Sequence, residues 1–541
     1  MTGIALVPQA KEGDEKMSTT RRQFVLGSVT AAALPFVPGT IAVSMAEDGA
    51  QTVRFAIQKP AGDLNPHIYS GLWGVQDLIF EPLVKYGKGG TFEPGLATAW
   101  DIENDGKLLR LHLRKGVAFH DGAPWNAEAL KWNFDRWIRL DDHSWINFAR
   151  LFEDLKIVDS HTVEIAFKEA PLGLMFELSY VRPVRFLSPT SVGADGAYRE
   201  PIGTGPWKQV SSGNAESVFE RYADYWGAKP AFERLEMKVL PDSRNRMAAL
   251  RAGEIDVTGG DFLAPITATE AKTLKDAGVA VEIAPGSTTM ILGFNPDRSK
   301  ALADPRVRKA ISLGFDRQAV STVLFAGFAQ PAGSMFVGSV PLAGRQFTPD
   351  KRDAAEAERL LDEAGWTGAP VRSKEGEALS IELVVSEEQI IGSRSVAEVM
   401  QAQLKEIGIE LSIRSVDHAS RHSDIPARKY DLAFFLTFGA PYDPYGTMIS
   451  YFLSTYDNGV DGKLYTDVEA LDPLLKAAMD ASIADSEKTL QAVYDWLHET
   501  TAIAPVLFLP SIWAHTERIE NFEPPATEFD TPYEKIAVNR T

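Results

Sequence analysis

Histidine is the residue type here that could do metal chemistry, because the chain has nine histidines and no cysteine. A neutral imidazole nitrogen is a common ligand of transition metals. Four of the nine fall in predicted loops where they could face a cleft, and these are the metal-ligand candidates: His67, His143, His418 and His422. His418 and His422 are four residues apart, so a helix would place both imidazoles on one side. A polar surface turn rich in Ser, Arg and Asp explains this spacing equally well.

Local enzyme motifs are absent from the sequence. It has no phosphate-binding loop, no His-Glu-x-x-His, no Gly-x-Ser-x-Gly and no thiol nucleophile. The glycines of residues 203–207 lack a following Lys-Ser or Lys-Thr, so they predict a structural turn. A hydrolase built from carboxylates far apart in sequence leaves no local signature, and it stays an alternative without positive support. We therefore expect a protein that is not an enzyme.

Composition narrows the class of protein further. The net charge of −19 argues against nucleic acid and anionic membranes as partners, because both select basic surfaces. Without cysteine, no lipid-modified cysteine can follow a signal peptide, so we expect no lipid anchor. A chain of 541 residues is too long for one hydrophobic core, which predicts two or more domains.

The N-terminus resembles an export signal. Arg21 and Arg22 precede an apolar stretch of small residues that runs to residue 43, and Ser44-Met45-Ala46 is suited to cleavage. We expect residues 1–46 to be an N-terminal extension and a twin-arginine signal peptide, with the protein released into the periplasm. A basic disordered N-terminus is the alternative interpretation. The polar residues 1–16 suggest that translation starts at Met17.

Strands and helices alternate along the rest of the chain. Leucines at 109, 111 and 113 alternate with polar residues, as in a half-buried strand, and Asn126 is suited to cap the helix that follows it. Strands are predicted at 53–57, 108–114, 163–167, 218–222, 254–257, 290–294, 379–385, 409–416, 431–436 and 504–510. Helices are predicted at 77–83, 126–138, 242–252, 304–319, 352–365, 394–407 and 486–503. The fold class is therefore α/β.

A polar turn after residue 294 marks a seam between two lobes. Lobe I would comprise residues 47–294 and 511–541, and lobe II residues 295–510. Two chain crossings between lobes make a cleft in which a ligand can bind.

Seven segments, spread over most of the chain, resemble one protein family. They are VRPVRF (181–186), PIGTGPW (201–207), FGAPYDP (438–444), and residues 81–86, 96–100, 113–119 and 222–227. Their order and spacing are similar to those of extracytoplasmic solute-binding proteins that serve ABC importers for nickel complexes, dipeptides and oligopeptides. The nickel-chelate branch is the most similar. The resemblance implies a large, three-subdomain periplasmic binding protein with a ligand cleft between two lobes and an inserted subdomain at about residues 92–200.

The resemblance also implies a set of ligand-binding residues. Arg182 matches an arginine that pairs with ligand carboxylates, which suits the planar fork of a guanidinium; an interdomain ion pair is its alternative role. For Arg185, a structural role is favoured. Tyr69, Trp145 and Tyr442 match aromatic residues of the pocket, where a ring can stack on an imidazole or a cationic complex. Each of the three could equally be a core residue.

Three departures from the family pattern concern the metal. Residues 445–465 contain no histidine, although a direct histidine ligand is expected there. Asp142 stands where an arginine is expected, and Phe438 stands where a tryptophan is expected. A chelate that already saturates its metal needs no protein ligand. Asp443 could bind a ligand ammonium group, or it could cap the turn before Pro444.

We therefore expect the periplasmic substrate-binding component of an ABC importer, which captures a nickel or other metal chelate. The alternative is a dipeptide, oligopeptide or opine receptor of the same type, and a periplasmic hydrolase on this scaffold ranks last. We expect a monomer whose partners are a small solute and the transmembrane subunits of the permease. No resident cofactor is expected, because the metal would arrive with the solute.

Overall fold

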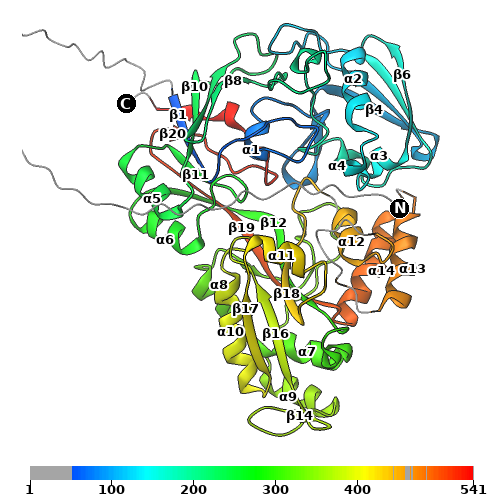
Figure 1. The fold of residues 1–541 in the computed structure, drawn as a ribbon, viewed down its shortest axis with the longest axis vertical. Helices are drawn as coiled ribbons and strands as arrows, with labels where there is room; N and C mark the ends of the chain where they lie inside the picture. Colours follow the sequence, from blue (N-terminus) through cyan, green and yellow to red (C-terminus); the bar gives the residue numbers. More distant parts are fainter. Residues whose placement is uncertain (1–51, 443, 457–463, 465–466, 483, 540–541) are drawn as a thin grey trace, which may run out of the picture. The chain divides into compact units, whose positions relative to one another are not determined.

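The computed structural model describes residues 52–539 except 443, 457–463, 465–466 and 483 (Figure 1). All of these belong to one compact unit, 48–541. The predicted signal peptide, residues 1–46, and the predicted ligand-binding residue Asp443 lie outside the described residues. No helix in the described part is long and apolar enough to cross a membrane.

One eleven-stranded sheet runs through the described unit. Its order is β17-β16-β18-β12-β19-β11-β1-β10-β9-β8, and β13 pairs with β19. Its strands are β1 (Thr52–Ile57), β8 (Trp207–Ser212), β9 (Glu216–Arg221), β10 (Arg234–Val239), β11 (Val257–Gly259), β12 (Ala280–Phe294), β13 (Gln330–Pro331), β16 (Ser380–Val385), β17 (Glu410–Ser415), β18 (Leu432–Leu436) and β19 (Ile503–His515). Parallel and antiparallel pairs are mixed in it, as β1 and β10 run parallel and β9 and β10 run antiparallel.

The two longest strands, β12 and β19, lie side by side in antiparallel register at the middle of this sheet (Figure 1). The register shifts between Pro285 and Thr289 and again between Met290 and Ile291. On one side of the shift β19 also pairs with β11, and on the other side β12 also pairs with β18. The predicted lobe boundaries at residues 294 and 510 both lie on these strands, and the division into two lobes stays a proposal.

Four helices share one hydrophobic core with the β16–β18 part of the sheet. They are α7 (Pro305–Gly314), α8 (Arg317–Leu324), α9 (Ala354–Glu363) and α10 (Ser393–Glu406). The other helices are α1 (Trp73–Gln76), α3 (Asn147–Leu151), α4 (Leu174–Glu177), α5 (Ser243–Ala252), α6 (Ala268–Asp276), α11 (His418–Asp424), α12 (Pro444–Phe452), α13 (Val468–Met479) and α14 (Ser486–Glu499). Leu361, Met400 and Leu404 are fully buried in the core that these helices share with the strands.

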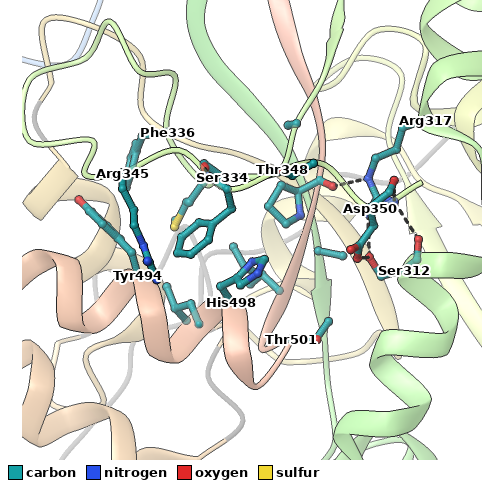
Figure 2. Close-up of a pocket in the computed structure, with 18 of the residues that line it drawn as sticks. Ser312, Arg317, Ser334, Phe336, Arg345, Thr348, Asp350, Tyr494, His498 and Thr501 are labelled. Atoms are coloured by element: carbon teal, nitrogen blue, oxygen red, sulfur yellow. Dashed lines mark hydrogen bonds between the residues drawn. The ribbon is translucent and has the colours of Figure 1, made fainter. Parts of the chain in front are cut away.

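A small cavity of about 40 Å³ lies beside α7 and α14 (Figure 2). Asp350 accepts hydrogen bonds from Lys309 at 2.7 Å and from the Ser312 hydroxyl at 2.7 Å. Arg317 donates to the carbonyl and hydroxyl oxygens of Ser312, both at 2.8 Å. These polar side chains hydrogen-bond to one another, and the space is too small for more than a few water molecules. This cavity is therefore structural.

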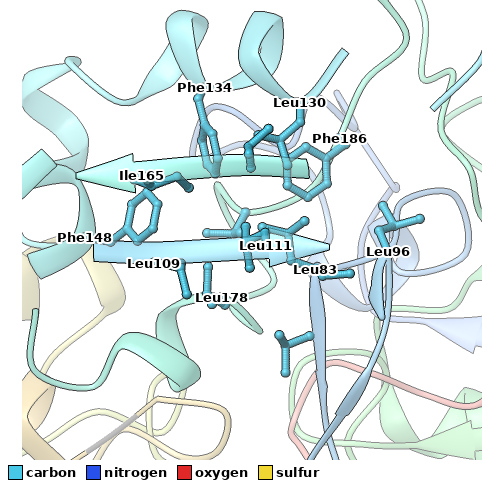
Figure 3. Packing of buried hydrophobic residues seen from close by; sticks show 14 of the residues in the cluster. Leu83, Leu96, Leu109, Leu111, Leu130, Phe134, Phe148, Ile165, Leu178 and Phe186 are labelled. Atoms are coloured by element: carbon cyan, nitrogen blue, oxygen red, sulfur yellow. The ribbon is translucent and has the colours of Figure 1, made fainter. Parts of the chain in front are cut away.

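A separate four-stranded sheet lies in the predicted inserted subdomain, with the order β4-β5-β7-β6. Its strands are β4 (Ala97–Glu103), β5 (Leu108–Leu113), β6 (Phe152–Asp159) and β7 (Thr162–Phe167). Helix α2 (Ala127–Trp137) covers this sheet, and Leu130 and Phe134 point toward the strands that carry Leu111 and Ile165 (Figure 3). The predicted cap is confirmed, because the Asn126 side chain accepts a hydrogen bond from the backbone of Ala129 at 3.0 Å.

Two predicted helices were wrong. A single helix over 304–319 is interrupted: Phe315 is buried in an extended conformation, and the Asp316 side chain caps the new helix α8. The predicted helix over 77–83 is replaced by the shorter α1, which ends before Asp77. Pro82 disfavours a helical conformation at the residue before it, and the run of Leu78, Ile79 and Phe80 is fully buried, so it shows no amphipathic period.

Three small pairs of strands complete the fold: β2 (Val84–Tyr86) with β3 (Phe92–Pro94), β14 (Ser373–Lys374) with β15 (Glu377–Ala378), and β20 (Ile519–Glu520) with β21 (Ala537–Val538).

Candidate solute-binding site

A cavity of about 1150 Å³ gathers residues from distant parts of the chain. Its walls come from the segments 69–73, 141–145, 261–269, 387–392, 435–442 and 509–512, with further residues from α8, α11 and the C-terminal segment. Five of the predicted ligand-binding residues line it together: Tyr69, Trp145, Arg182, Phe438 and Tyr442. Asp142, which replaces an expected arginine, also lines it and is exposed.

Arg182 is buried against two aromatic rings of this cavity. Only 2% of the residue is exposed. Its guanidinium carbon lies 3.6 Å from the centroid of the Trp73 ring and 4.5 Å from that of Tyr69. Its Nε and Nη1 have no hydrogen-bond partner, and no carboxylate among the described residues forms an ion pair with it. Burial lowers the pKa of Arg182 to about 10, so the group remains charged at neutral pH. An anion in the cavity would therefore meet a desolvated guanidinium whose Nε and Nη1 groups can each donate a hydrogen bond.

Arg185 has the structural role that the sequence favoured. It is fully buried, and its Nη2 lies 2.9 Å from a carboxylate oxygen of Asp530 and 3.8 Å from Asp77. It also donates to the backbone carbonyls of Ser179 at 3.2 Å and Tyr180 at 2.5 Å. These bonds tie the 181–186 segment to the C-terminal segment and thereby hold Arg182 in place.

Tyr69 is held by a chain of hydrogen bonds. The ring Nε2 of His143 lies 2.9 Å from the carbonyl of His67, and a carbonyl only accepts, so Nε2 carries the proton. In the neutral ring Nδ1 is then an acceptor, and the Tyr69 hydroxyl donates to it at 2.9 Å. Trp145 donates its indole N–H to the same hydroxyl at 2.5 Å. The Tyr69 hydroxyl thus donates its proton to His143, and the centroid of the Tyr69 ring lies 4.5 Å from the guanidinium carbon of Arg182.

Two of the metal-ligand candidates, His67 and His143, are buried and lie outside the cavity lining. His67 donates through Nε2 to the carbonyl of Arg185 at 3.1 Å. Burial lowers the pKa of His67 to about 3, against the smaller opposing effect of that hydrogen bond. Burial likewise lowers the pKa of His143. Both rings are therefore neutral at pH 7, and they serve as hydrogen-bonding residues that support Tyr69 and Arg185.

The other two candidates, His418 and His422, lie on α11 with ring centroids 4.3 Å apart. The spacing of four therefore does place both imidazoles on one side of a helix. Only His422 lines the cavity. Within the part of the chain that the structure describes, no group of three or more His, Asp or Glu side chains is arranged to hold a metal ion. The protein side of the cavity thus offers at most an incomplete coordination shell.

Several aromatic residues of the cavity were missed by the sequence reasoning, and three of them contact one another: Trp73, Phe262 and Phe529. The Trp73 ring stacks on Phe262 at 5.8 Å between centroids and contacts Phe529 at 5.0 Å. Phe262 and Phe529 are 4.9 Å apart, and Tyr442 contacts Phe529 at 5.9 Å. Together they form an aromatic wall from Arg182 to Tyr442. Residues 73, 262 and 529 belong to three distant segments with no shared period, so no local pattern relates them.

Two acidic residues at this wall, Asp261 and Glu528, were also missed. Glu528 accepts a hydrogen bond from the Thr288 hydroxyl, and its backbone N–H donates to the carbonyl of Ala440 at 3.2 Å. Distance from bulk water and then the charge of Asp261 raise the pKa of Glu528 to about 8. Asp261 lines the same cavity and is an exposed residue, although desolvation by the protein around it raises its pKa to about 6.

A large cavity with an aromatic wall and a buried guanidinium, that of Arg182, with unpaired donors suits the capture of a small solute. The chain belongs to the bacterial extracellular solute-binding proteins, family 5, whose middle region matches residues 91–459. It is a non-enzymatic substrate-binding protein of the ABC-importer type, which confirms the predicted family and sets the hydrolase alternative aside.

Individual relatives support this classification. The chain is 30% identical to the nickel-binding periplasmic protein of Escherichia coli K12 over 492 residues, which are 88% of this chain and 92% of that protein. A crystal structure of an ABC transporter substrate-binding protein from Sinorhizobium meliloti is 55% identical, with a TM-score of 0.81, and the match covers 90% of this chain and all of that one. NikA from Brucella suis, in complex with Fe(III)-EDTA, is 30% identical, with a TM-score of 0.84 and the same coverage. The mixed α/β periplasmic binding-protein fold is confirmed by these matches.

Proposed function

We propose that this protein captures a nickel chelate, or a chelate of another metal, and delivers it to the permease of an ABC importer. The observation that carries the proposal is the buried guanidinium of Arg182, which lines the cavity between two aromatic rings and has unpaired donors. A chelator's carboxylate can accept two parallel hydrogen bonds from such a group. The similarity to the nickel-binding protein of E. coli and to NikA supports a metal chelate as the first candidate.

The remaining chemistry of the cavity suits a chelate whose metal is already saturated. His422 is the one imidazole among the cavity-lining residues, and residues 445–465 contain no histidine. A metal held by its own organic ligands needs no protein donor, so recognition falls to Arg182 and to the aromatic rings of Tyr69, Trp145 and Tyr442.

A dipeptide, an oligopeptide or an opine is the second candidate. Any of them has a free carboxylate that Arg182 would bind equally well. The acidic pair Asp261 and Glu528 favours this candidate, because a peptide also carries a positive charge. Asp443 remains a candidate partner for that charge.

The first experiment is native mass spectrometry of protein purified from the periplasm without added solute, followed by calorimetric titration. The nickel(II)–L-histidine complex and free-acid dipeptides are the probes. The proposal predicts a co-purifying, carboxylate-bearing metal complex and saturable binding of the nickel probe. Binding of dipeptides alone would establish the second candidate, and binding of no probe would contradict both.

A further inference from the structure

We propose that Asp261 and Glu528 together bind a protonated amine of the solute, in the same cavity that Arg182 lines. The inference rests on the proposed function, because it takes the cavity to be the solute site and Arg182 to be the carboxylate anchor. Of the two candidates it favours the dipeptide, oligopeptide or opine, because it narrows the solute class to molecules that carry both a carboxylate and a positively charged amine.

Both carboxylates line the same cavity as Arg182 but reach it from separate segments. Asp261 lies in the loop between β11 and α6, and Glu528 lies in the C-terminal segment. The residue after each acid joins the aromatic wall, since Phe262 and Phe529 are 4.9 Å apart. Trp73 contacts both of these rings and also the Arg182 guanidinium. A bound molecule that spans the Trp73 ring would therefore meet opposite charges at its two ends.

Neither acid is neutralised by the protein. Among the described residues, no Lys, Arg or His nitrogen lies within 4.0 Å of Asp261 or Glu528. The side-chain hydrogen bond that Glu528 accepts comes from the neutral hydroxyl of Thr288. The charge of Asp261 is close enough to raise the pKa of Glu528, so the two carboxylates ionise together at lower cost when a cation joins them. Desolvation raises the pKa of both groups, and for Glu528 the charge of Asp261 adds to this effect.

The surroundings favour an organic cation over a bare metal ion. The acids are flanked by the rings of Phe262, Phe529 and Trp73, whose faces attract an ammonium group. No third acidic or imidazole side chain joins Asp261 and Glu528 in the described structure, so a metal ion would lack ligands. Arg182, 2% exposed and with unpaired donors, supplies the complementary anchor in the same cavity.

The test compares two probes that differ only in their amine: alanyl-alanine as the free acid, and its N-acetyl derivative, which keeps the carboxylate but has no positive charge. Calorimetric titrations are done with wild type, Glu528→Gln and Asp261→Asn. Glu523→Gln is the matched control, because Glu523 lies on the same segment but pairs with Lys88 at the surface. The nickel(II)–L-histidine complex, whose amines are coordinated to the metal, is the third probe.

We expect the free-amine dipeptide to bind wild type at least about tenfold more tightly than the acetylated one. Glu528→Gln and Asp261→Asn should reduce that preference to less than about threefold, whereas Glu523→Gln should keep it. Equal affinity of wild type for both dipeptides, or a preference that survives both substitutions, overturns this inference. Binding of the nickel complex alone also overturns it while leaving the proposed function intact. Failure of wild type to bind any probe overturns the proposed function, and this inference with it.

Discussion

The guanidinium of Arg182 lies 3.6 Å from the centroid of the Trp73 ring, inside the cavity that also holds Asp261 and Glu528. The partner of the Arg182 guanidinium is therefore the Trp73 ring, whereas in an ion pair the partner would be a carboxylate. A ring stabilises the guanidinium without using its N–H donors, so these donors remain for a ligand. Arg185, only three residues further on, is paired with Asp530, so one segment supplies both the proposed binding group and a structural one.

Removal of the Trp73 ring should weaken solute binding without disrupting the fold. For Trp73→Leu we expect a loss of about 1 kcal/mol, or roughly fivefold in Kd, because Arg182 loses its stacking partner. Trp132→Leu is the matched control, since Trp132 also stacks with an arginine, Arg136, but does not line the cavity. Calorimetric titration with the best-binding probe decides the matter. Equal losses in the two variants would show that Trp73 has no special role.

Burial of His67 predicts a pH dependence of stability. The unfolded ring takes up a proton near pH 6.5 and the folded ring near pH 3, so the stability that His67 contributes is complete above pH 6.5 and is lost as the pH falls toward 3. Between pH 7 and pH 5 the loss is about 2 kcal/mol. Asp77, Glu81 and Glu528, whose pKa values are raised, change stability in the opposite sense, so the comparison must be made between variants.

Urea unfolding of wild type and His67→Gln at pH 7 and pH 5 isolates this contribution. The pH-dependent change in unfolding free energy should be about 2 kcal/mol smaller in the variant. His112→Gln controls for the loss of a surface histidine, which contacts Asp101. If His67→Gln and wild type lose the same free energy on acidification, the buried neutral state of His67 is refuted.

Gly439 is predicted to be essential for the position of Glu528. A Cβ atom at this position would overlap the Glu528 carboxylate and lie 2.7 Å from the Thr288 hydroxyl. Gly439→Ala should break the hydrogen bond between these two side chains and lower the unfolding free energy by about 1–2 kcal/mol. Gly213→Ala is the control, because the nearest atom to its added Cβ is 3.5 Å away. Similar unfolding midpoints for the two variants would contradict the tight packing around Glu528.

Export is a prediction from sequence alone. The pair Arg21 and Arg22 should be required for delivery to the periplasm, because twin-arginine recognition reads both guanidinium groups. Cell fractionation of the Arg21→Lys, Arg22→Lys double variant should show precursor retained in the cytoplasm. Normal periplasmic yield of the double variant would defeat the assignment.

Local patterns in the sequence were sufficient for most elements of the fold. The alternation of Leu109, Leu111 and Leu113 and the cap at Asn126 each identify an element through neighbours in sequence, and both are found in the structure. The helix predicted over 77–83 failed because Leu78, Ile79 and Phe80 are all buried, so their pattern carries no period. Where burial is complete, sequence periodicity gives no information about the element.

Only part of the candidate site could be predicted from the sequence, because the rest depends on contacts between distant segments. Arg182, Tyr69, Trp145, Phe438 and Tyr442 were found through motifs that resemble a known family, and all five line one cavity. Trp73, Phe262 and Phe529 assemble through contacts between segments up to 456 residues apart, and such contacts leave no trace in local spacing. The histidine candidates failed in a different way: their predicted loop positions suggested that His67 and His143 could face the cleft, whereas both are buried and lie outside the cavity lining.

The central claim is that Arg182 anchors a solute carboxylate. If its guanidinium is replaced, a desolvated carboxylate is left without a partner, which should cost about 2–5 kcal/mol of binding free energy. Arg182→Lys should recover only part of this loss, because an ammonium group lacks the planar fork. Arg114→Ala is the control, since Arg114 stacks on Trp226 at 4.4 Å outside the cavity.

The most direct measurement is calorimetric titration of folded Arg182→Ala with the nickel(II)–L-histidine complex and with a free-acid dipeptide, beside wild type and Arg114→Ala. The account predicts that every probe bound by wild type is lost, or weakened at least about 30-fold, in Arg182→Ala and retained in Arg114→Ala. Near wild-type affinity of Arg182→Ala for the probe that wild type binds best would contradict it.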